Sequence, residues 1–156
     1  MFSWRVVKKR LVRKAIKPKA KSYLEFKETA RVLIHQQLEF YNQTNEFTYM
    51  RVAIRDQRRC WGSCSSKGNL NFSYKLLFLP ACLRDYIIIH ELCHLKVLNH
   101  STSFWNEVAE RMPDYVTRMQ NLRTLEKTLG TSLIALRKYQ ATHHCEVCEL
   151  QVSNLK

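Results

Sequence analysis

The strand-like segments of this 156-residue chain are confined to residues 48–74, with helical patterns on both sides. Residues 48–55 alternate between apolar and polar side chains and are rich in β-branched and aromatic residues, which favours a strand. Residues 60–64 and 70–74 are two further strand candidates, and the sequence Ser-Ser-Lys-Gly-Asn between them is typical of a turn. We therefore expect a small antiparallel sheet in the first half of the chain.

Apolar residues at helical spacing predict helices before and after this sheet. One such pattern covers residues 22–42, and another begins after Pro80 and continues to residue 98. Three shorter helical patterns follow, at residues 104–112, from 113 toward 130 and at roughly 131–141. A helix, a small sheet and then several helices, in that order, predict an α+β fold.

A metal-binding pattern lies inside the helix that follows Pro80. His90 and His94 belong to the sequence His-Glu-Leu-Cys-His, and residues four apart in a helix lie on one face, so both imidazoles can reach one ion. Zinc binds neutral imidazole and accepts a tetrahedral site with one open position. Glu91 directly follows the first histidine, so it can stand beside that position and accept a proton from water whose acidity the metal has raised. The spacing predicts metal-assisted hydrolysis with Glu91 as the general base.

A catalytic zinc usually has three protein ligands, and His100 is the leading candidate for the third. On an unbroken helix His100 would lie about 9 Å beyond His94 and on another face. The helix must therefore end near Val97–Asn99, so that the chain can turn back. Glu107 and Glu110, in the next helical segment, are the alternative third ligands.

Residues 54–115 resemble the YgjP-type metallopeptidase domain, a family related to the SprT-like and WLM-type zinc peptidases. The resemblance implies a zincin-like fold, a single catalytic zinc with His100 as its third ligand, and hydrolysis of peptide bonds. One departure is Cys60, which stands where the family usually has Arg. The matching residues are Trp-Gly-Ser-Cys at 61–64, Gly68–Asn69, Asn71, Pro80, the motif at 90–94, His100, Phe104–Trp105 and Pro113–Asp114–Tyr115.

Residues around the motif helix are further candidates for the site. Trp61, Gly62 and Ser63 are candidates for substrate binding, because an exposed strand edge can pair with an extended peptide. The alternative is that these three residues only pack the sheet against the helix. Phe104 and Trp105 are expected to pack the segment that returns to the metal.

A second metal site is a weaker expectation. Cys145 and Cys148 form a Cys-x-x-Cys pair near the C-terminus. A structural zinc site needs four ligands, and Cys60 and Cys64 could supply the other two. The alternative is a pair of free thiols in a tail.

The net charge of +13 lies mostly in an N-terminal arm. Residues 1–21 contain nine Lys or Arg and no acid, so the other 135 residues, with 17 basic and 13 acidic side chains, carry only +4. Such an arm can neutralise phosphates, which makes DNA or RNA a candidate partner; a solvated basic tail is the alternative. The predicted organisation is the arm at 1–21, a zincin-like metallopeptidase domain at 22–141 and a tail at 142–156.

The absence of certain segments supports a cytoplasmic location. No run of 18 or more apolar residues occurs, so we expect no membrane span. The first residues lack the long apolar stretch and cleavage site of a secretory signal. Together with the metal-binding motif, these features predict a cytoplasmic zinc metallopeptidase that acts on proteins or peptides. The alternative is a zinc-stabilised nucleic-acid-binding module with weak or vestigial peptidase activity, with DNA-associated proteins as its substrates.

Overall fold

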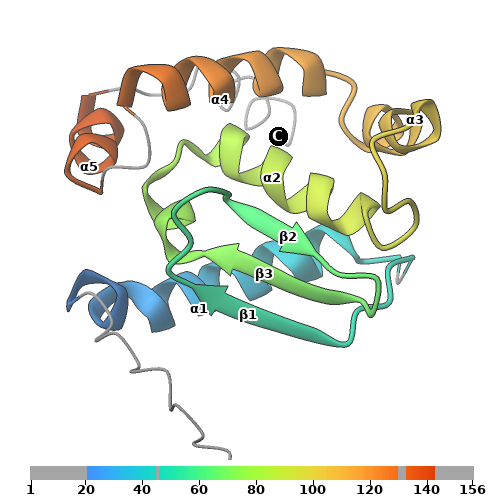
Figure 1. Cartoon of the computed structure of the whole chain (residues 1–156), viewed down its shortest axis with the longest axis horizontal. Coiled ribbons are helices and arrows are strands. Elements are labelled where there is room, and N and C mark those ends of the chain that lie inside the picture. Colours follow the sequence, from blue (N-terminus) through green and yellow to red (C-terminus); the bar gives the residue numbers. More distant parts are fainter. Residues whose placement is uncertain (1–20, 45, 130–132, 143–156) are drawn as a thin grey trace, which may run out of the picture.

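The computed structural model describes residues 21–44, 46–129 and 133–142, and it has the predicted α+β fold (Figure 1). The basic arm up to residue 20, together with Cys145 and Cys148, lies outside these described residues. In chain order the elements are α1 (Lys21–Tyr41), β1 (Arg51–Arg55), β2 (Gly62–Cys64), β3 (Asn69–Ser73), the 3₁₀ helix η1 (Tyr74–Phe78), α2 (Ala81–Cys93), α3 (Thr102–Arg111), α4 (Tyr115–Leu129) and α5 (Leu133–Thr142).

The three strands form a mixed sheet in the order β1-β3-β2. Strand β3 pairs antiparallel with β2, as predicted, with Gly62 opposite Phe72. It pairs parallel with β1, with Arg51 opposite Asn69, so the expectation of a wholly antiparallel sheet is wrong for this pair. The alternation of apolar residues predicts each strand. It does not indicate which edge of β3 pairs with β1, or whether the two strands run parallel or antiparallel.

The turn between β2 and β3 explains why this hairpin was visible in the sequence. Gly68 has φ of 71°, in the left-handed region that glycine adopts without steric cost. The N–H of Gly68 donates to the carbonyl of Ser65 at 2.9 Å, and the N–H of Ser65 donates to that of Asn69 at 3.0 Å. The carbonyl of Gly68 in turn accepts from the N–H of Met50, which ties the start of β1 to the same turn.

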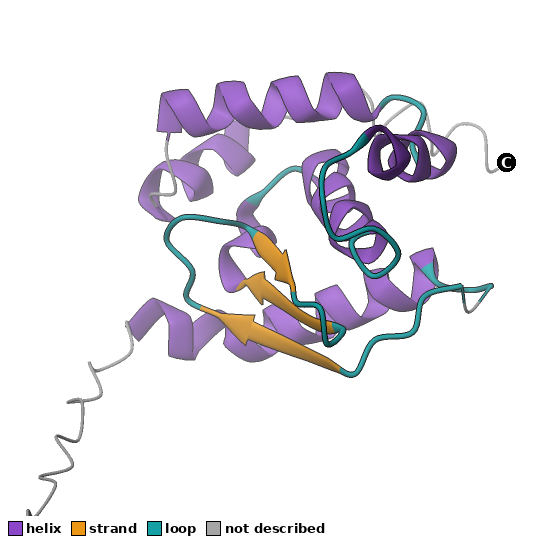
Figure 2. Cartoon of the chain, turned by 45° about the vertical axis from the view of Figure 1, so that its right-hand side comes forward, coloured by secondary structure: helices purple, strands orange, loops and turns teal. Residues whose placement is uncertain are grey.

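Helix α2 is the central element of the molecule. It packs against α1 and β2 on one side and against α3 and α4 on the other, and Figure 1 shows it between the sheet and α4. Figure 2, turned by 45° from that view, shows α1 passing behind the strands. The hydrophobic core contains fully buried side chains from α1, β3 and α2: Ile34, Leu38, Leu70, Phe72, Ile88 and Leu92. No helix in the described ranges has the length and apolar character that a membrane span requires.

Helix α2 ends earlier than predicted, at Cys93 rather than near Val97–Asn99. A tight turn follows, in which the N–H of Leu95 donates to the carbonyl of Leu92 and the N–H groups of Lys96 and Val97 donate to that of Cys93. The side chain of Asn99 then accepts from the backbone N–H of Ser101 and leads the chain into α3. The chain reverses as the third-ligand hypothesis requires, but through hydrogen-bonded turns that a helical period does not reveal.

Candidate metal centre and cleft

Three imidazoles converge where α2 ends. His90 lies in the last turn of α2, His94 caps that helix, and His100 lies just before α3. The Nε2 atom of His90 is 3.1 Å from the Nε2 atoms of both His94 and His100. One ring nitrogen from each residue lies within 4.8 Å of the other two. The structure thus brings together the three residues predicted as ligands from the sequence.

The spacing of these nitrogens fits one metal ion. In a tetrahedral zinc site with Zn–N distances of about 2.0–2.1 Å, two ligand nitrogens lie about 3.4 Å apart. A ring nitrogen offers either one hydrogen or one lone pair, so Nε2 of His90 cannot form good hydrogen bonds to two other imidazoles at once. A shared ion satisfies all three nitrogens, and imidazole is a ligand that zinc accepts readily.

The protonation states favour metal binding. Burial, followed by the charges of His94 and His100, lowers the pKa of His90 to about 3. Burial also lowers the pKa of His94. Nδ1 of His94 lies 3.0 Å from the carbonyl oxygen of Val97, which can only accept, so this nitrogen carries the hydrogen. Nε2 of His94 is thereby left with a free lone pair that faces the other two imidazoles.

Aromatic side chains from α3 hold the imidazoles in place. Phe104, which is fully buried, stacks on His94 with ring centres 4.4 Å apart and meets His90 and His100 edge to face. Trp105 stacks on His100 at 5.7 Å. The expected packing of Phe104 and Trp105 against the returning segment is therefore present, and it restricts the orientation of all three rings.

Glu91 lies against β2 at Gly62, where a residue with a larger side chain would collide with the glutamate. A Cβ atom on Gly62 would stand 2.7 Å from both Cγ and Oε1 of Glu91, closer than real Cβ contacts allow. Glu91 is 6% exposed, and its Oε2 atom has no hydrogen-bond partner among the described residues. Burial raises the pKa of this carboxyl to about 8. The sequence offered Gly62 as a substrate-binding residue; its contact with Glu91 was missed, because nothing in a strand pattern indicates which helix lies opposite.

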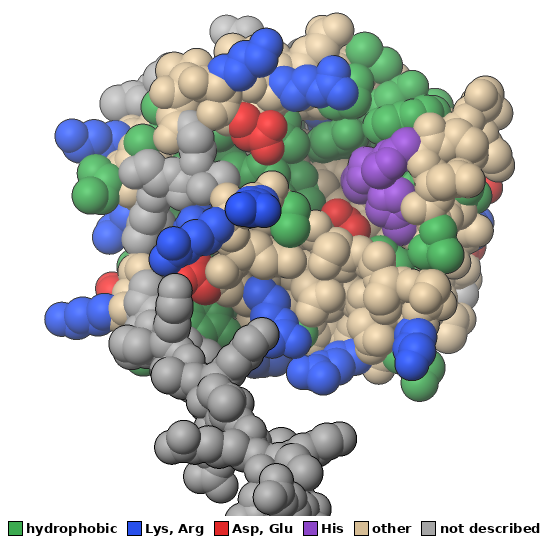
Figure 3. Space-filling view, in the orientation of Figure 1, with side chains coloured by type: hydrophobic (Ala, Val, Ile, Leu, Met, Phe, Trp, Pro, Cys, Tyr) green, Lys and Arg blue, Asp and Glu red, His purple; other side chains and the backbone are tan. Residues whose placement is uncertain are grey.

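An open cleft of about 450 Å³ leads to these residues. Its walls come from residues 59–64, from α2 and from α4, and His90, Glu91, His94 and His100 all line it. Figure 3 shows histidine side chains reaching the surface on one face of the molecule. The four candidate residues therefore lie together in a cleft that opens to the surface.

The predicted substrate-binding residues form one wall of this cleft. Trp61 is only 6% exposed, and its Nε1 atom donates to Oε1 of Glu126 at 2.7 Å. Ser63 accepts a hydrogen bond from the side-chain amide of Asn71 on β3. Across residues 21–44, 46–129 and 133–142, β2 pairs with β3 alone, so its other edge is open. Packing is visible for all three residues, and substrate binding stays a prediction.

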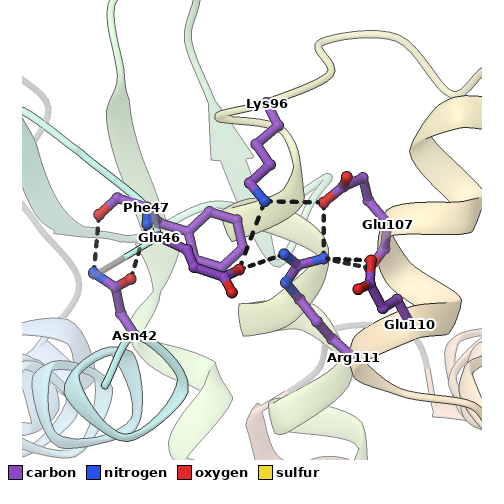
Figure 4. A network of polar contacts seen from close by, with 7 residues as sticks. All are labelled: Asn42, Glu46, Phe47, Lys96, Glu107, Glu110 and Arg111. Carbon is purple, nitrogen blue, oxygen red and sulfur yellow. Dashed lines mark hydrogen bonds and ion pairs between the residues drawn. The ribbon is translucent and has the colours of Figure 1, made fainter. Parts of the chain in front are cut away.

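The alternative third ligands, Glu107 and Glu110, belong to a separate ion network (Figure 4). Arg111 pairs with Glu107 at 2.7 Å and with Glu110 at 3.8 Å, and it also pairs with Glu46. Lys96 joins the same network through Glu107 at 3.3 Å and Glu46 at 3.6 Å. Neither glutamate is grouped with the three histidines, so His100 is the third residue that the structure places at the site.

This network fixes the turn between two candidate ligands. The side chain of Asn42 bonds both the N–H and the carbonyl of Phe47, each at 2.9 Å. The Arg111 guanidinium and the Lys96 ammonium lie over the Phe47 ring, at 4.9 and 5.2 Å from its centre. These contacts join the loop after α1, the turn after α2 and helix α3.

The described cysteines give no support to a second zinc site. Cys60 and Cys64 are free thiols, and neither belongs to a cluster of metal-binding side chains in the described ranges. Cys93, the third free cysteine, is fully buried. Since Cys145 and Cys148 lie outside the described residues, the second site stays a prediction.

Comparison with known proteins agrees with the resemblance seen in the sequence. The model of the YgjP-like metallopeptidase domain matches residues 2–125. No curated protein matches the chain. The crystal structure of the metallopeptidase zymogen of Pyrococcus abyssi abylysin is similar, with 29% sequence identity and a TM-score of 0.51 over 61% of this chain and 94% of that chain. Since the family model spans well over half of its length, the chain belongs to the YgjP-like metallopeptidase domain family.

Proposed function

We propose that this chain is a zinc-dependent peptidase in which His90, His94 and His100 hold the metal and Glu91 is the general base. The observation that carries the proposal is the convergence of three imidazole nitrogens inside an open cleft, with Nε2 of His90 3.1 Å from the Nε2 atoms of the other two. The unpartnered oxygen of Glu91 in the same cleft supports it. A purely structural metal site would not need this carboxylate.

The proposed chemistry divides the work between the metal and Glu91. Zinc, when bound, polarises the scissile carbonyl and makes water a better nucleophile at neutral pH. Glu91 accepts the proton of the attacking water and delivers it to the leaving amine. A base must be ionised, and a cation held by the neighbouring imidazoles favours the carboxylate over the neutral acid. Gly62 supports this role, because it leaves room for the Glu91 side chain against β2.

The substrate we propose is an extended segment of protein or peptide. The open edge of β2 offers backbone N–H and carbonyl groups beside the cleft, and an extended chain can add to such an edge as a further strand. Backbone pairing of this kind depends little on sequence. Ser63, in the middle of β2, would lie next to the incoming chain.

The decisive experiment combines zinc content with cleavage. We expect about one zinc per purified chain and cleavage of an unfolded protein substrate. Glu91→Gln should keep the zinc and lose about 100-fold or more of the activity, since it removes only the base. His100→Ala should lose both, whereas His35→Ala, on α1 and outside the cleft, should change neither. Full zinc content with undiminished cleavage by Glu91→Gln would refute the assignment of the base.

A second candidate function is nucleic-acid binding through the basic arm. Nine of the first 21 residues are Lys or Arg. If the arm contacts phosphates, affinity for DNA or RNA should fall steeply as salt rises and should be lost when residues 1–20 are removed. Zinc binding and salt-sensitive nucleic-acid binding without any cleavage would favour this candidate over the peptidase. DNA-stimulated cleavage would support both functions in one protein.

A further inference from the structure

One part of the cleft combines an apolar wall with a single carboxylate that the proposed reaction does not use. Ile87 on α2 and Leu122 on α4 are buried residues that line the cleft, together with the ring of Tyr86. Glu126 lies one helical turn after Leu122 on α4, is exposed, and lines the same cleft. Apolar surface next to one acidic group is chemically distinct from the region around the histidines.

Trp61 holds the Glu126 carboxylate in a defined position. Its buried indole donates to Oε1 of Glu126 at 2.7 Å, across 65 residues of sequence. Within the part of the chain that the structure describes, Glu126 has no ion pair to Lys or Arg, even though Arg59 lines the same cleft. The carboxylate is therefore oriented by a neutral donor and keeps its negative charge available to a ligand.

We propose that this part of the cleft binds the side chain of a lysine or arginine close to the scissile bond of the substrate. The aliphatic stem of such a residue would contact Ile87 and Leu122, and its cationic head would pair with Glu126. An aspartate or glutamate would be repelled by Glu126, and a purely apolar side chain would cover the carboxylate without pairing it. The inference rests on the proposed peptidase function, for which it names a class of preferred substrate.

A purely structural role for Glu126, as the acceptor for Trp61, makes a different prediction. Glu126→Gln keeps an oxygen that can accept from the indole and removes only the charge. If the carboxylate binds a basic side chain of the substrate, this variant changes the preference among peptide substrates. If the carboxylate only holds Trp61, that preference is unchanged. Glu25→Gln makes the same charge change at an exposed residue of α1 that does not line this cleft, and is the matched control.

The test compares acetylated and amidated peptides that carry lysine, arginine, norleucine or glutamate at each position around the cleaved bond. Blocked termini ensure that only side chains are read. We expect wild type to prefer lysine or arginine over norleucine at one position by about fivefold in kcat/KM at low salt. The preference should fall below about twofold in Glu126→Gln and should persist in Glu25→Gln, which should cleave the norleucine peptide at the wild-type rate. Rising salt should reduce the preference in wild type.

Binding to zinc-loaded Glu91→Gln, with and without Glu126→Gln, separates this inference from the peptidase proposal. Cleavage without a basic preference, or with a preference that survives in Glu126→Gln, overturns the inference and leaves the peptidase intact. Tighter binding of basic peptides that depends on Glu126, but no cleavage by wild type, supports the subsite and overturns the peptidase. If neither selective binding nor cleavage is observed, both the inference and the peptidase proposal are overturned.

Discussion

At the scale of single residues, the contact between Gly62 and Glu91 gives the sharpest prediction. Gly62→Ala places a methyl group 2.7 Å from the Glu91 side chain, so the carboxylate must move away from its present position. A displacement of about 1 Å at a reacting group can cost on the order of 100-fold in rate. We therefore expect kcat to fall by about that factor while zinc content, measured by metal analysis, stays at the wild-type level.

Gly68→Ala is the matched control for this substitution. Gly68 has a positive φ, and a Cβ atom there would be no closer than 3.6 Å to its neighbours, which is ordinary contact. The variant should lose about 1 kcal/mol of stability through backbone strain and keep the kcat of wild type. If Gly62→Ala behaves in the same way, with reduced stability and full activity, the proposed role of Gly62 is wrong.

The candidate site shows which residues a sequence can reveal. His90, Glu91 and His94 follow from their spacing within one helix, and His100 follows from the need for a third ligand. Gly62 and Glu126 could not be assigned their contacts in this way, because each meets a partner far away in the sequence. Such pairings depend on how β2 and α4 pack on α2, and short-range patterns do not contain that information.

At the scale of elements, the packing of α1 on α2 includes a half-buried carboxyl group. Asp85 on α2 lies near Tyr41 at the end of α1, and the cations Arg84 and Arg118 are also near. Burial is the largest effect and raises the pKa of Asp85 above its ordinary value of 3.8. The neutral form is therefore favoured by folding, and the charged form opposes it.

This raised pKa predicts a pH-dependent effect of Asp85→Asn. The stabilising contribution of Asp85 is fully present below the unfolded-state pKa, near pH 4, and is lost as the pH rises through the folded-state pKa. Asparagine has nearly the same shape as aspartate but does not titrate. The variant should therefore gain stability relative to wild type between pH 4 and pH 7, measured as the difference in free energy of unfolding from urea titrations. A difference that is constant with pH, or that shifts against the variant, would contradict this account.

The ion network around Arg111 predicts that a substitution on α3 affects zinc binding through the turn that follows α2. Arg111→Met removes the cation that joins Glu46 to Glu107, and so loosens the turn between His94 and His100. We expect zinc to transfer to a chelator about tenfold faster than from wild type, because loss of the contacts that hold metal ligands in place typically changes metal affinity by about 10–100-fold. Arg31→Met breaks an exposed ion pair with Glu28 on α1 and should leave the transfer rate unchanged. Equal rates for both variants would show that the network does not support the metal centre.

At the scale of the whole molecule, the order of elements was predictable and their arrangement only in part. The sequence indicated a helix, three strands and further helices, because each has its own apolar period. It did not indicate that β1 runs parallel to β3, or that α2 ends at Cys93, four residues before Val97. Both features depend on tertiary contacts, because the hydrogen-bond partners of the backbone groups are not specified by any local sequence pattern.

The arrangement of the three histidines makes the metal a cross-link between parts of the fold. His90 and His94 belong to the end of α2, while His100 belongs to the segment that leads into α3, whose Phe104 packs on all three rings. A ligand that binds only the folded state stabilises it by about 4 kcal/mol when present at 1,000 times its dissociation constant. For a chain of this size, this corresponds to a rise in Tm of roughly 10 °C.

Removal of zinc by a chelator should therefore lower the Tm of wild type by about that amount, and re-addition of zinc should restore it. His100→Gln should show little response to either treatment, since it lacks one of the three ligands, whereas His35→Gln should respond like wild type. Hydrogen exchange should locate the loosened region between the end of α2 and the start of α3, because those are the segments that the metal joins. A Tm that is insensitive to zinc in wild type, or equally sensitive in His100→Gln, would mean that the three imidazoles do not share an ion.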